Sequence, residues 1–188
     1  MLVFLTIILS VISFLLIFII IFFFFFAIDL FLDLPYVATK KGRIGTIIRL
    51  ANIKKGETVI DLGSGDGRLL FAAAQKGARA IGYEINPFLI IFTRIGARIK
   101  GLDHSRSVLR SSKAHSGSVI VKRENLWKAN LKVADVVFVY GRKKTMQKFE
   151  DFVYRNAKKG TRIVVNTNPF PNKRPIKSEN EIFLYRIS

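Results

Sequence analysis

The chain has 188 residues, enough for one ordinary domain and a short accessory segment but not for two full domains. It contains no cysteine, which excludes disulfides, thiolate catalysis and cysteine-ligated zinc. Its formal net charge is +18, and all 31 lysines and arginines come after residue 39.

Residues 1–28 are predicted to be a single transmembrane helix. Leu2 to Ile28 contains no charged residue, and this run exceeds the roughly 20 helical residues that cross a bilayer core. A cleaved signal peptide is a poor match, because the segment lacks an early basic residue and a small-residue cleavage site. A buried helix of a soluble core is the other alternative, but the Phe22–Phe26 block would be difficult to bury in so small a protein.

The basic residues behind the apolar run indicate its orientation. Four of them follow it closely: Lys40, Lys41, Arg43 and Arg49. Since basic flanks stay on the cytoplasmic side, we expect a single-pass membrane protein whose C-terminal domain faces the cytoplasm. Attraction to anionic lipid headgroups, worth about 1 kcal/mol per basic residue near the surface, explains the excess charge. Nucleic-acid binding and a plain solvated surface are the competing explanations.

Residues 29–56 are predicted to be a linker followed by one amphipathic helix. Pro35 and the two acids Asp29 and Asp33 indicate that the chain from Asp29 to Thr39 is a linker. Over residues 41–52, four apolar residues form one helical stripe: Ile44, Ile47, Ile48 and Ala51. This helix could lie on a membrane surface or pack over the following domain, and packing is favoured.

Strand and helix patterns alternate over residues 57–188. Five strand patterns are visible, at 57–62, 78–84, 118–124, 133–140 and 161–167. Helical patterns lie between several of them, at 68–77, 87–100 and 143–158. The alternation predicts an α/β domain with a mostly parallel sheet and helices on both faces. A pattern at 181–187 predicts an antiparallel edge strand, and the few residues after the fifth strand imply an abbreviated C-terminal edge.

A polar and basic stretch at 102–117 is predicted to be a surface insertion. It contains both histidines of the chain, His104 and His115. Two histidines among serines and basic residues are more typical of a solvated loop than of a metal site, so we predict no bound metal.

The residues with the clearest chemistry follow the first strand, where the sequence reads DLGSGDG from Asp61 to Gly67. Ligands of open α/β sheets bind at the carboxyl ends of strands, and glycines there let a ligand approach the backbone. Arg68 stands where a dinucleotide site would have its third glycine, which argues against NAD. Asp61 favours a cationic ligand such as S-adenosylmethionine, which carries an ammonium and a sulfonium. Glu84, at the end of the second strand, can accept hydrogen bonds from ribose hydroxyls.

These motifs resemble a known family. VIDLGSGDGR (59–68) resembles motif I of class I methyltransferases, and GYEINPFL (82–89) carries the acidic position that follows it. With PYVAT (35–39), NLWKANL (125–131) and NPFP (168–171), the chain resembles the membrane-anchored protein-lysine methyltransferases related to the ATP synthase c-subunit and adenine nucleotide translocase lysine methyltransferases. The resemblance runs from about Pro35 to the C-terminus. It implies a Rossmann-like fold and S-adenosylmethionine-dependent methylation of a lysine on a membrane protein, in a eukaryote at the mitochondrial inner membrane.

The chain departs from the family's pattern at two places. Where the family usually has an acid that binds the adenine amino group, this chain has Asn125, whose amide oxygen can still accept. Residues 141–146 (GRKKTM) replace a G-V-P-x-M-M motif, so the wall facing the substrate has changed. The cofactor-binding residues expected from motif and resemblance are Asp61, Gly63, Ser64, Gly65, Gly67, Glu84 and Asn125.

No catalytic base is predicted, because methyl transfer from a sulfonium mainly requires alignment and a neutral acceptor. Tyr140 ends the fourth strand, and Asn168 and Phe170 follow the fifth; we expect these three to position the substrate. The alternative roles are packing for Tyr140 and Phe170 and a turn for Asn168.

Three alternative functions stay open. A nucleic-acid methyltransferase would suit the charge, but enzymes that methylate exocyclic base amines usually carry an Asn/Asp-Pro-Pro-aromatic motif after strand four, where this chain reads YGRKK from Tyr140. A small-molecule methyltransferase is a further variant. An inactive membrane-bound scaffold is the third possibility, against which the intact glycine turn and Glu84 argue.

Overall fold

The computed structural model describes residues 1–31, 39, 41–103 and 117–188, which fall into two units, Met1–Tyr36 and Val37–Ser188. The predicted linker around Pro35 and the predicted insertion with His104 and His115 lie outside the described residues.

The first unit contains one helix, α1 (Leu2–Phe31), among its described residues. The helix continues past Ile28, the predicted end of the anchor. Within it, Val3–Phe24 is long and apolar enough to cross a membrane, judged by length and composition.

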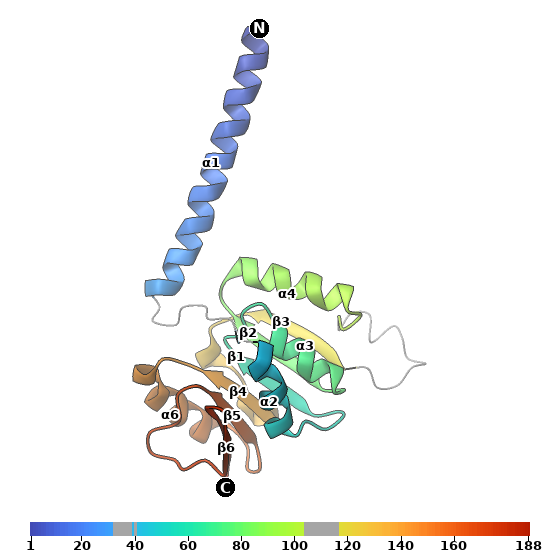
Figure 1. Cartoon of the computed structure of the whole chain (residues 1–188), viewed down its shortest axis with the longest axis vertical. Helices are drawn as coiled ribbons and strands as arrows, with labels where there is room; N and C mark the ends of the chain where they lie inside the picture. Colours follow the sequence, from blue (N-terminus) through green and yellow to red (C-terminus); the bar gives the residue numbers. More distant parts are fainter. Residues whose placement is uncertain (32–38, 40, 104–116) are drawn as a thin grey trace. The chain divides into compact units, whose positions relative to one another are not determined.

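The second unit is an α/β domain built on a seven-stranded sheet with the order β3-β2-β1-β4-β5-β7-β6 (Figure 1). Five strands are parallel: β1 (Thr58–Leu62), β2 (Arg79–Glu84), β3 (Ser118–Arg123), β4 (Val136–Tyr140) and β5 (Arg162–Asn166). The strand order reverses between β1 and β4, so their carboxyl ends form the topological switch point at which such sheets bind ligands. The predicted mostly parallel sheet is confirmed.

Helices cover both faces of this sheet. They are α2 (Lys41–Ala51), α3 (Arg68–Gln75), α4 (Pro87–Ile99) and α6 (Met146–Asn156), with short 3-10 turns η1 (Leu126–Lys128), η2 (Leu131–Val133) and η3 (Lys143–Thr145). Right-handed crossovers place α3 and α4 on one face and α6 on the other. Residues of α2, α3 and α4 share one hydrophobic core with the strands. Ile47 and Ala51 of α2 are buried in it, which confirms that this helix packs over the domain.

The C-terminal strands correct one prediction. The strand predicted at 181–187 exists as β7 (Ile182–Arg186) and pairs antiparallel with β5, but it is not the edge of the sheet. A three-residue strand, β6 (Lys177–Glu179), pairs outside it. Asn180 and Glu181 join the two with φ angles of 50° and 58°, as a tight two-residue hairpin requires. The sequence Lys-Ser-Glu has no apolar alternation, so β6 could not be recognised from its pattern.

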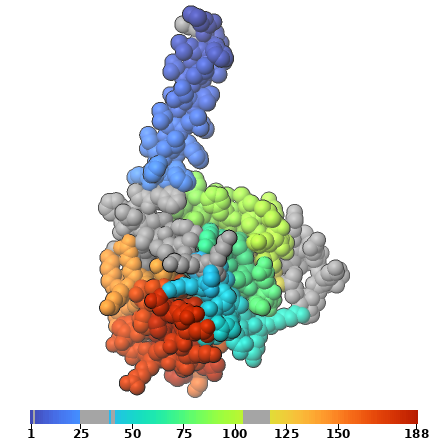
Figure 2. All heavy atoms as spheres, in the orientation of Figure 1, coloured from blue at the N-terminus to red at the C-terminus, as the bar shows by residue number. Residues whose placement is uncertain are grey.

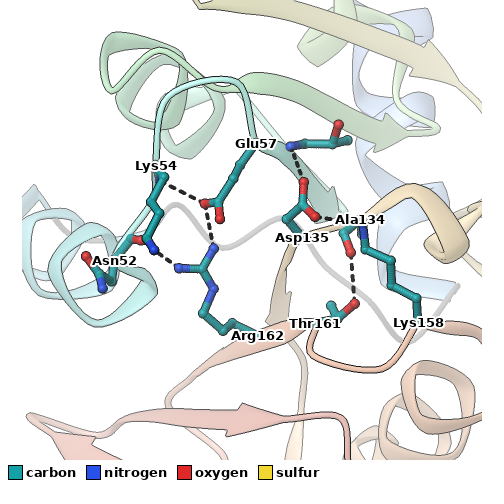
Figure 3. A network of polar contacts seen from close by, with 9 residues as sticks. Asn52, Lys54, Glu57, Ala134, Asp135, Lys158, Thr161 and Arg162 are labelled. Carbon is teal, nitrogen blue, oxygen red and sulfur yellow. Dashed lines mark hydrogen bonds and ion pairs between the residues drawn. The ribbon is translucent and has the colours of Figure 1, made fainter.

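A polar network holds the amino ends of the strands together, at the edge opposite the switch point (Figure 3). The buried guanidinium of Arg162, at the start of β5, donates to the Asn52 carbonyl oxygen at 2.6 Å and to Glu57 Oε2 at 2.5 Å. This ion pair connects β5 to the segment that enters β1.

Asp135 connects the same edge from the start of β4. Its carboxylate accepts from the Thr58 backbone N–H at 2.8 Å and from Lys158 Nζ at 2.7 Å. Burial raises the pKa of Asp135, but these two hydrogen bonds together with the positive charges of Lys158 and Arg162 outweigh that effect and hold the pKa below its ordinary value. The network therefore fixes the relative positions of β1, β4 and β5 at their amino ends. It uses no residue from the carboxyl ends, where the switch point lies.

Candidate functional site

The glycine turn between β1 and α3 forms the centre of the candidate site. Gly63, Gly65 and Gly67 all have left-handed φ angles, of 88°, 55° and 79°. At Gly67 the constraint is also steric, because a Cβ there would lie 2.6 Å from Thr93 Cγ2 of α4. The turn therefore needs glycine both for its backbone conformation and for its close approach to α4.

Glu84, at the carboxyl end of β2, holds this turn in place. Its Oε2 accepts a hydrogen bond from the Gly65 backbone N–H at 2.9 Å. Its Oε1 accepts from the backbone N–H groups of Ile85 at 2.8 Å and Asn86 at 2.9 Å. Asn86 in turn caps α4, with Oδ1 accepting from the Phe88 N–H at 3.0 Å. One half-buried carboxylate thus joins the glycine turn, the end of β2 and the start of α4.

Asp61 is the buried acid of the site. It lies on β1 and is 6% exposed. Burial, followed by the negative charges of Glu84 and Asp66, raises the pKa of Asp61 to about 7 from its ordinary value of 3.8. A carboxyl group with such a pKa near neutrality is typical of functional sites, where a cationic ligand can stabilise the ionised form.

Ser64 packs inward, against β2. Its hydroxyl is buried and has no hydrogen-bond partner within the described residues. A Cβ at Gly82 of β2 would lie 2.6 Å from Leu70 Cδ1 and still closer to Ser64 Oγ, so only glycine fits there. The backbone N–H of Ser64 donates to the Tyr83 carbonyl oxygen at 3.1 Å. Gly82 is a supporting residue that the motif analysis missed.

Two further residues support the turn. The buried Thr93 of α4 donates from Oγ1 to the Gly65 carbonyl oxygen at 3.2 Å. Arg68 forms an ion pair with Asp66 and donates from Nη1 to the Thr39 carbonyl oxygen at 2.7 Å. Thr39 is the one described residue of the PYVAT motif, so this bond connects that motif to the glycine turn. Neither contact could be read from the sequence, since each depends on the tertiary structure.

Asn125 lies where the chain leaves β3, beside the end of β2. The Glu124 backbone N–H donates to the Glu84 carbonyl oxygen at 3.1 Å, which joins the two strand ends. Asn125 Oδ1 caps η1 by accepting from the Trp127 N–H at 3.0 Å. A Cβ at Gly63 would lie 3.7 Å from Leu126 Cδ2, so Leu126 of η1 lies next to the glycine turn.

The three predicted substrate-positioning residues occupy different environments. Tyr140 is half-buried at the end of β4, and its register partner in β5 is Asn166. Asn168 Nδ2 donates to the Gly141 carbonyl oxygen at 2.8 Å, so the segments that leave β4 and β5 are joined. Phe170 is 3% exposed, and its ring packs 4.7 Å from that of Tyr185, a position inside the core.

A strained residue, which the sequence analysis also missed, lies between Asn166 and Asn168. Thr167 has a φ of 77°, which is unusual for a β-branched residue. Arg43 of α2 donates to Thr167 Oγ1 at 2.8 Å and to Asn166 Oδ1 at 3.0 Å, and forms an ion pair with Glu181. Strain of this kind persists only when the surroundings over-determine it, and it is frequent at functional sites.

Comparison with known proteins identifies related sequences. The model of the ANTKMT methyltransferase domain family matches residues 61–177, from the glycine turn to the start of β6. The chain is 33% identical over 150 residues to the adenine nucleotide translocase lysine N-methyltransferase of Mus musculus, covering 79% of this chain and 59% of that protein. It is 30% identical over 144 residues to the ATP synthase c-subunit lysine N-methyltransferase of Xenopus laevis, covering 77% and 58%. It therefore spans less than two thirds of either relative.

A solved structure with a similar fold is the RNA methyltransferase from Salinibacter ruber in complex with S-adenosyl-L-homocysteine. The TM-score is 0.66 at 27% sequence identity, and the similarity covers 80% of this chain and 92% of that one. The predicted Rossmann-like methyltransferase fold is confirmed.

Proposed function

The chain belongs to the ANTKMT methyltransferase family, and we propose that it is an S-adenosylmethionine-dependent protein-lysine N-methyltransferase that acts on a membrane protein. The observation that carries this proposal is the arrangement at the switch point. There, a buried acid and a glycine turn held by Glu84 lie at adjacent strand ends.

The residues present fit S-adenosylmethionine, which supplies an activated methyl group when bound. Asp61 offers a buried carboxylate for the cationic methionine end, and binding a cation there would favour its ionised form. The glycine turn lets the cofactor approach the backbone. We assign Glu84 to accept hydrogen bonds from the ribose hydroxyls and Asn125 to accept from the adenine amino group.

The chain's own groups must align an acceptor amine and keep it neutral. An ordinary lysine has a pKa of about 10.4, and burial beside a cation lowers it. The acceptor ammonium would first lose a proton to solvent. The nitrogen–carbon bond would then form as the carbon–sulfur bond of the bound cofactor breaks, which leaves a neutral thioether and a methylated ammonium. Alignment of this kind can contribute about 7–11 kcal/mol to lowering the barrier. We assign the alignment to Tyr140 and to Asn168, which is fixed to Gly141. The inward position of Phe170 suits support of β5 from within the core.

Helix α1 would anchor this domain as a single-pass span. Its mean hydropathy over Val3–Phe24 is 3.3, and the basic residues that begin at Lys40 favour a cytoplasmic domain. Confinement beside the bilayer would raise the effective concentration of the site toward membrane-bound acceptors. The names of the relatives in mouse and Xenopus support a lysine acceptor on a membrane-associated protein.

RNA methylation is the second candidate, since the solved structure of similar fold is an RNA methyltransferase and the chain carries a net charge of +18. An inactive scaffold is the third. Calorimetric titration of the full-length protein in detergent with S-adenosylmethionine tests the cofactor site that both enzymes require. We expect saturable binding, whereas no binding would contradict either enzymatic function and favour the scaffold.

A further inference from the structure

Helix α4 is apolar on two opposite faces. Leu89, Ile90, Thr93 and Ala97 form its buried face against the domain. On the other side, four large apolar side chains are exposed: Ile91 at 51%, Phe92 at 60%, Ile95 at 51% and Ile99 at 79%. A surface helix of a soluble domain carries polar residues on its outer face, so this exposed stripe calls for a partner.

The four exposed residues form one continuous surface. At about 100° per residue, Ile91, Phe92, Ile95 and Ile99 fall within an arc of about 100° around the helix axis. In the space-filling view, the yellow-green side chains of α4 lie at the surface of the domain (Figure 2). We refer to these four residues as the α4 stripe.

Basic residues accompany the α4 stripe. Arg94 and Arg98 lie on the same helix and are exposed, Lys100 follows at its end, and α4 contains no acidic residue. An apolar stripe flanked by arginine and lysine is the composition of helices that lie in the interface of an anionic bilayer. The long basic side chains can reach the phosphate layer while the apolar groups insert.

The short chain segment between α1 and the domain also favours a bilayer over a protein partner. Residues 32–38 separate α1 from Thr39, a span of at most roughly 30 Å when fully extended. The Thr39 carbonyl oxygen accepts a hydrogen bond from Arg68, which lies beside the glycine turn. Thr93 of α4 donates a hydrogen bond to the same turn. If α1 spans a membrane, the start of the domain and α4 are both held within reach of its surface.

We propose that the α4 stripe inserts into the interface of an anionic bilayer and is a second membrane contact besides α1. The domain then lies with α4 along the bilayer, and the carboxyl edge of the sheet opens beside the membrane surface. This inference rests on the proposed anchoring by α1. It adds an orientation of the domain in which the candidate site would face an acceptor at the level of the lipid headgroups.

The absence of cysteine from the chain permits a direct test. Ile95→Cys in the full-length protein is labelled with a nitroxide and placed in nanodiscs of phosphatidylcholine with phosphatidylglycerol. Val133→Cys is the matched control, because Val133 is 48% exposed and lies in η2, which precedes the amino end of β4. We expect the label at Ile95 to be more accessible to oxygen than to a water-soluble nickel chelate, and the label at Val133 to show the reverse.

Other outcomes would contradict either the α4 contact alone or the anchoring by α1 as well. If the protein stays in the nanodisc but both labels are accessible to nickel, the α4 contact is wrong while the anchoring stands. If alkaline washing extracts the protein from liposomes, the anchoring and the α4 contact both fail. Dipolar broadening between labels at Ile95 would identify a second copy as the partner instead of lipid. Circular dichroism of Ile95→Cys checks that its fold is intact.

Discussion

The carboxylate of Glu84, at the carboxyl end of β2, accepts a hydrogen bond from the backbone N–H of Gly65 at 2.9 Å. Gly65 lies in the turn that follows the adjacent strand, β1. The residue expected to bind the ribose is therefore also the residue that shapes the glycine turn. Removing it should affect both the contact with the cofactor and the preorganisation of the loop.

Glu84→Ala should weaken S-adenosylmethionine binding by about 1.5–3 kcal/mol, the range for hydrogen bonds to a charged group, or roughly 10- to 150-fold. Calorimetry measures the affinity. Asp151→Asn, at a half-buried position of α6 outside the candidate site, is the control for the loss of one negative charge and should bind as wild type. Equal affinity of Glu84→Ala and wild type would remove Glu84 from the site.

Asp61 should make cofactor binding depend on pH. Because its pKa is raised to about 7, the free protein holds a proton there that a cationic ligand must displace. Affinity should therefore increase as pH rises from about 6 to about 8, by at most about tenfold per pH unit, with protons released on binding. Titrations in buffers of different ionisation enthalpy measure that release, and Asp61→Asn should bind weakly with no such dependence.

The Asp61 carboxyl group should also make the stability of the ligand-free protein depend on pH. Stability should fall as pH rises, whereas cofactor affinity should rise. The folded state keeps a proton that the unfolded chain, with a pKa near 3.8, has already released. The free energy of unfolding contributed by Asp61 should thus fall as pH rises from about 4 to about 7. Thermal unfolding of the ligand-free protein checks this. Asp61→Asn should be at least as stable as wild type at pH 8, and a less stable variant there would contradict the raised pKa.

Asn125→Asp should bind the cofactor as well as wild type or better. An aspartate keeps the oxygen that caps η1 and adds a second, charged acceptor for the adenine amino group. Asn125→Ala loses the cap, which costs about 0.5–2 kcal/mol, and loses the acceptor as well. If alanine and aspartate bind equally, position 125 does not contact the adenine.

Deleting residues 1–31 should leave a domain that binds the cofactor, because Asp61, the glycine turn and Glu84 lie in the second unit. Some affinity for anionic vesicles should remain and should weaken with salt, since surface attraction is screened over about 8 Å at physiological ionic strength. Vesicle sedimentation at low and high salt measures it. Equal binding to neutral and anionic vesicles would contradict the electrostatic part of the account.

The sequence predicted the parts of the fold that local patterns specify. The stripe of α2, the five parallel strands and the glycine turn each follow from periodicity or from backbone requirements. Including residue 133 in the fourth strand was wrong, because Asn130 caps η2 (Leu131–Val133) by accepting from the Lys132 N–H at 3.2 Å.

The supporting residues of the site could not be predicted in the same way. Thr93 contacts Gly65, and Arg43 contacts Thr167, across sequence separations that no local pattern marks. The position of Phe170 after strand five predicts a role in substrate positioning, but side-chain direction at a turn is decided by packing, and its ring lies against Tyr185. The carboxyl ends of the five parallel strands could be located from the sequence, whereas the contacts that orient them could not.

The most direct test of the account is methyl transfer from labelled S-adenosylmethionine to membranes of a strain that lacks this protein, with purified full-length enzyme added. We predict label on a lysine of a membrane protein, located by mass spectrometry, and transfer by Glu84→Ala that is roughly 10- to 150-fold lower at limiting cofactor. Label confined to RNA, lipid or a small molecule would contradict the lysine acceptor and leave only the methyltransferase assignment.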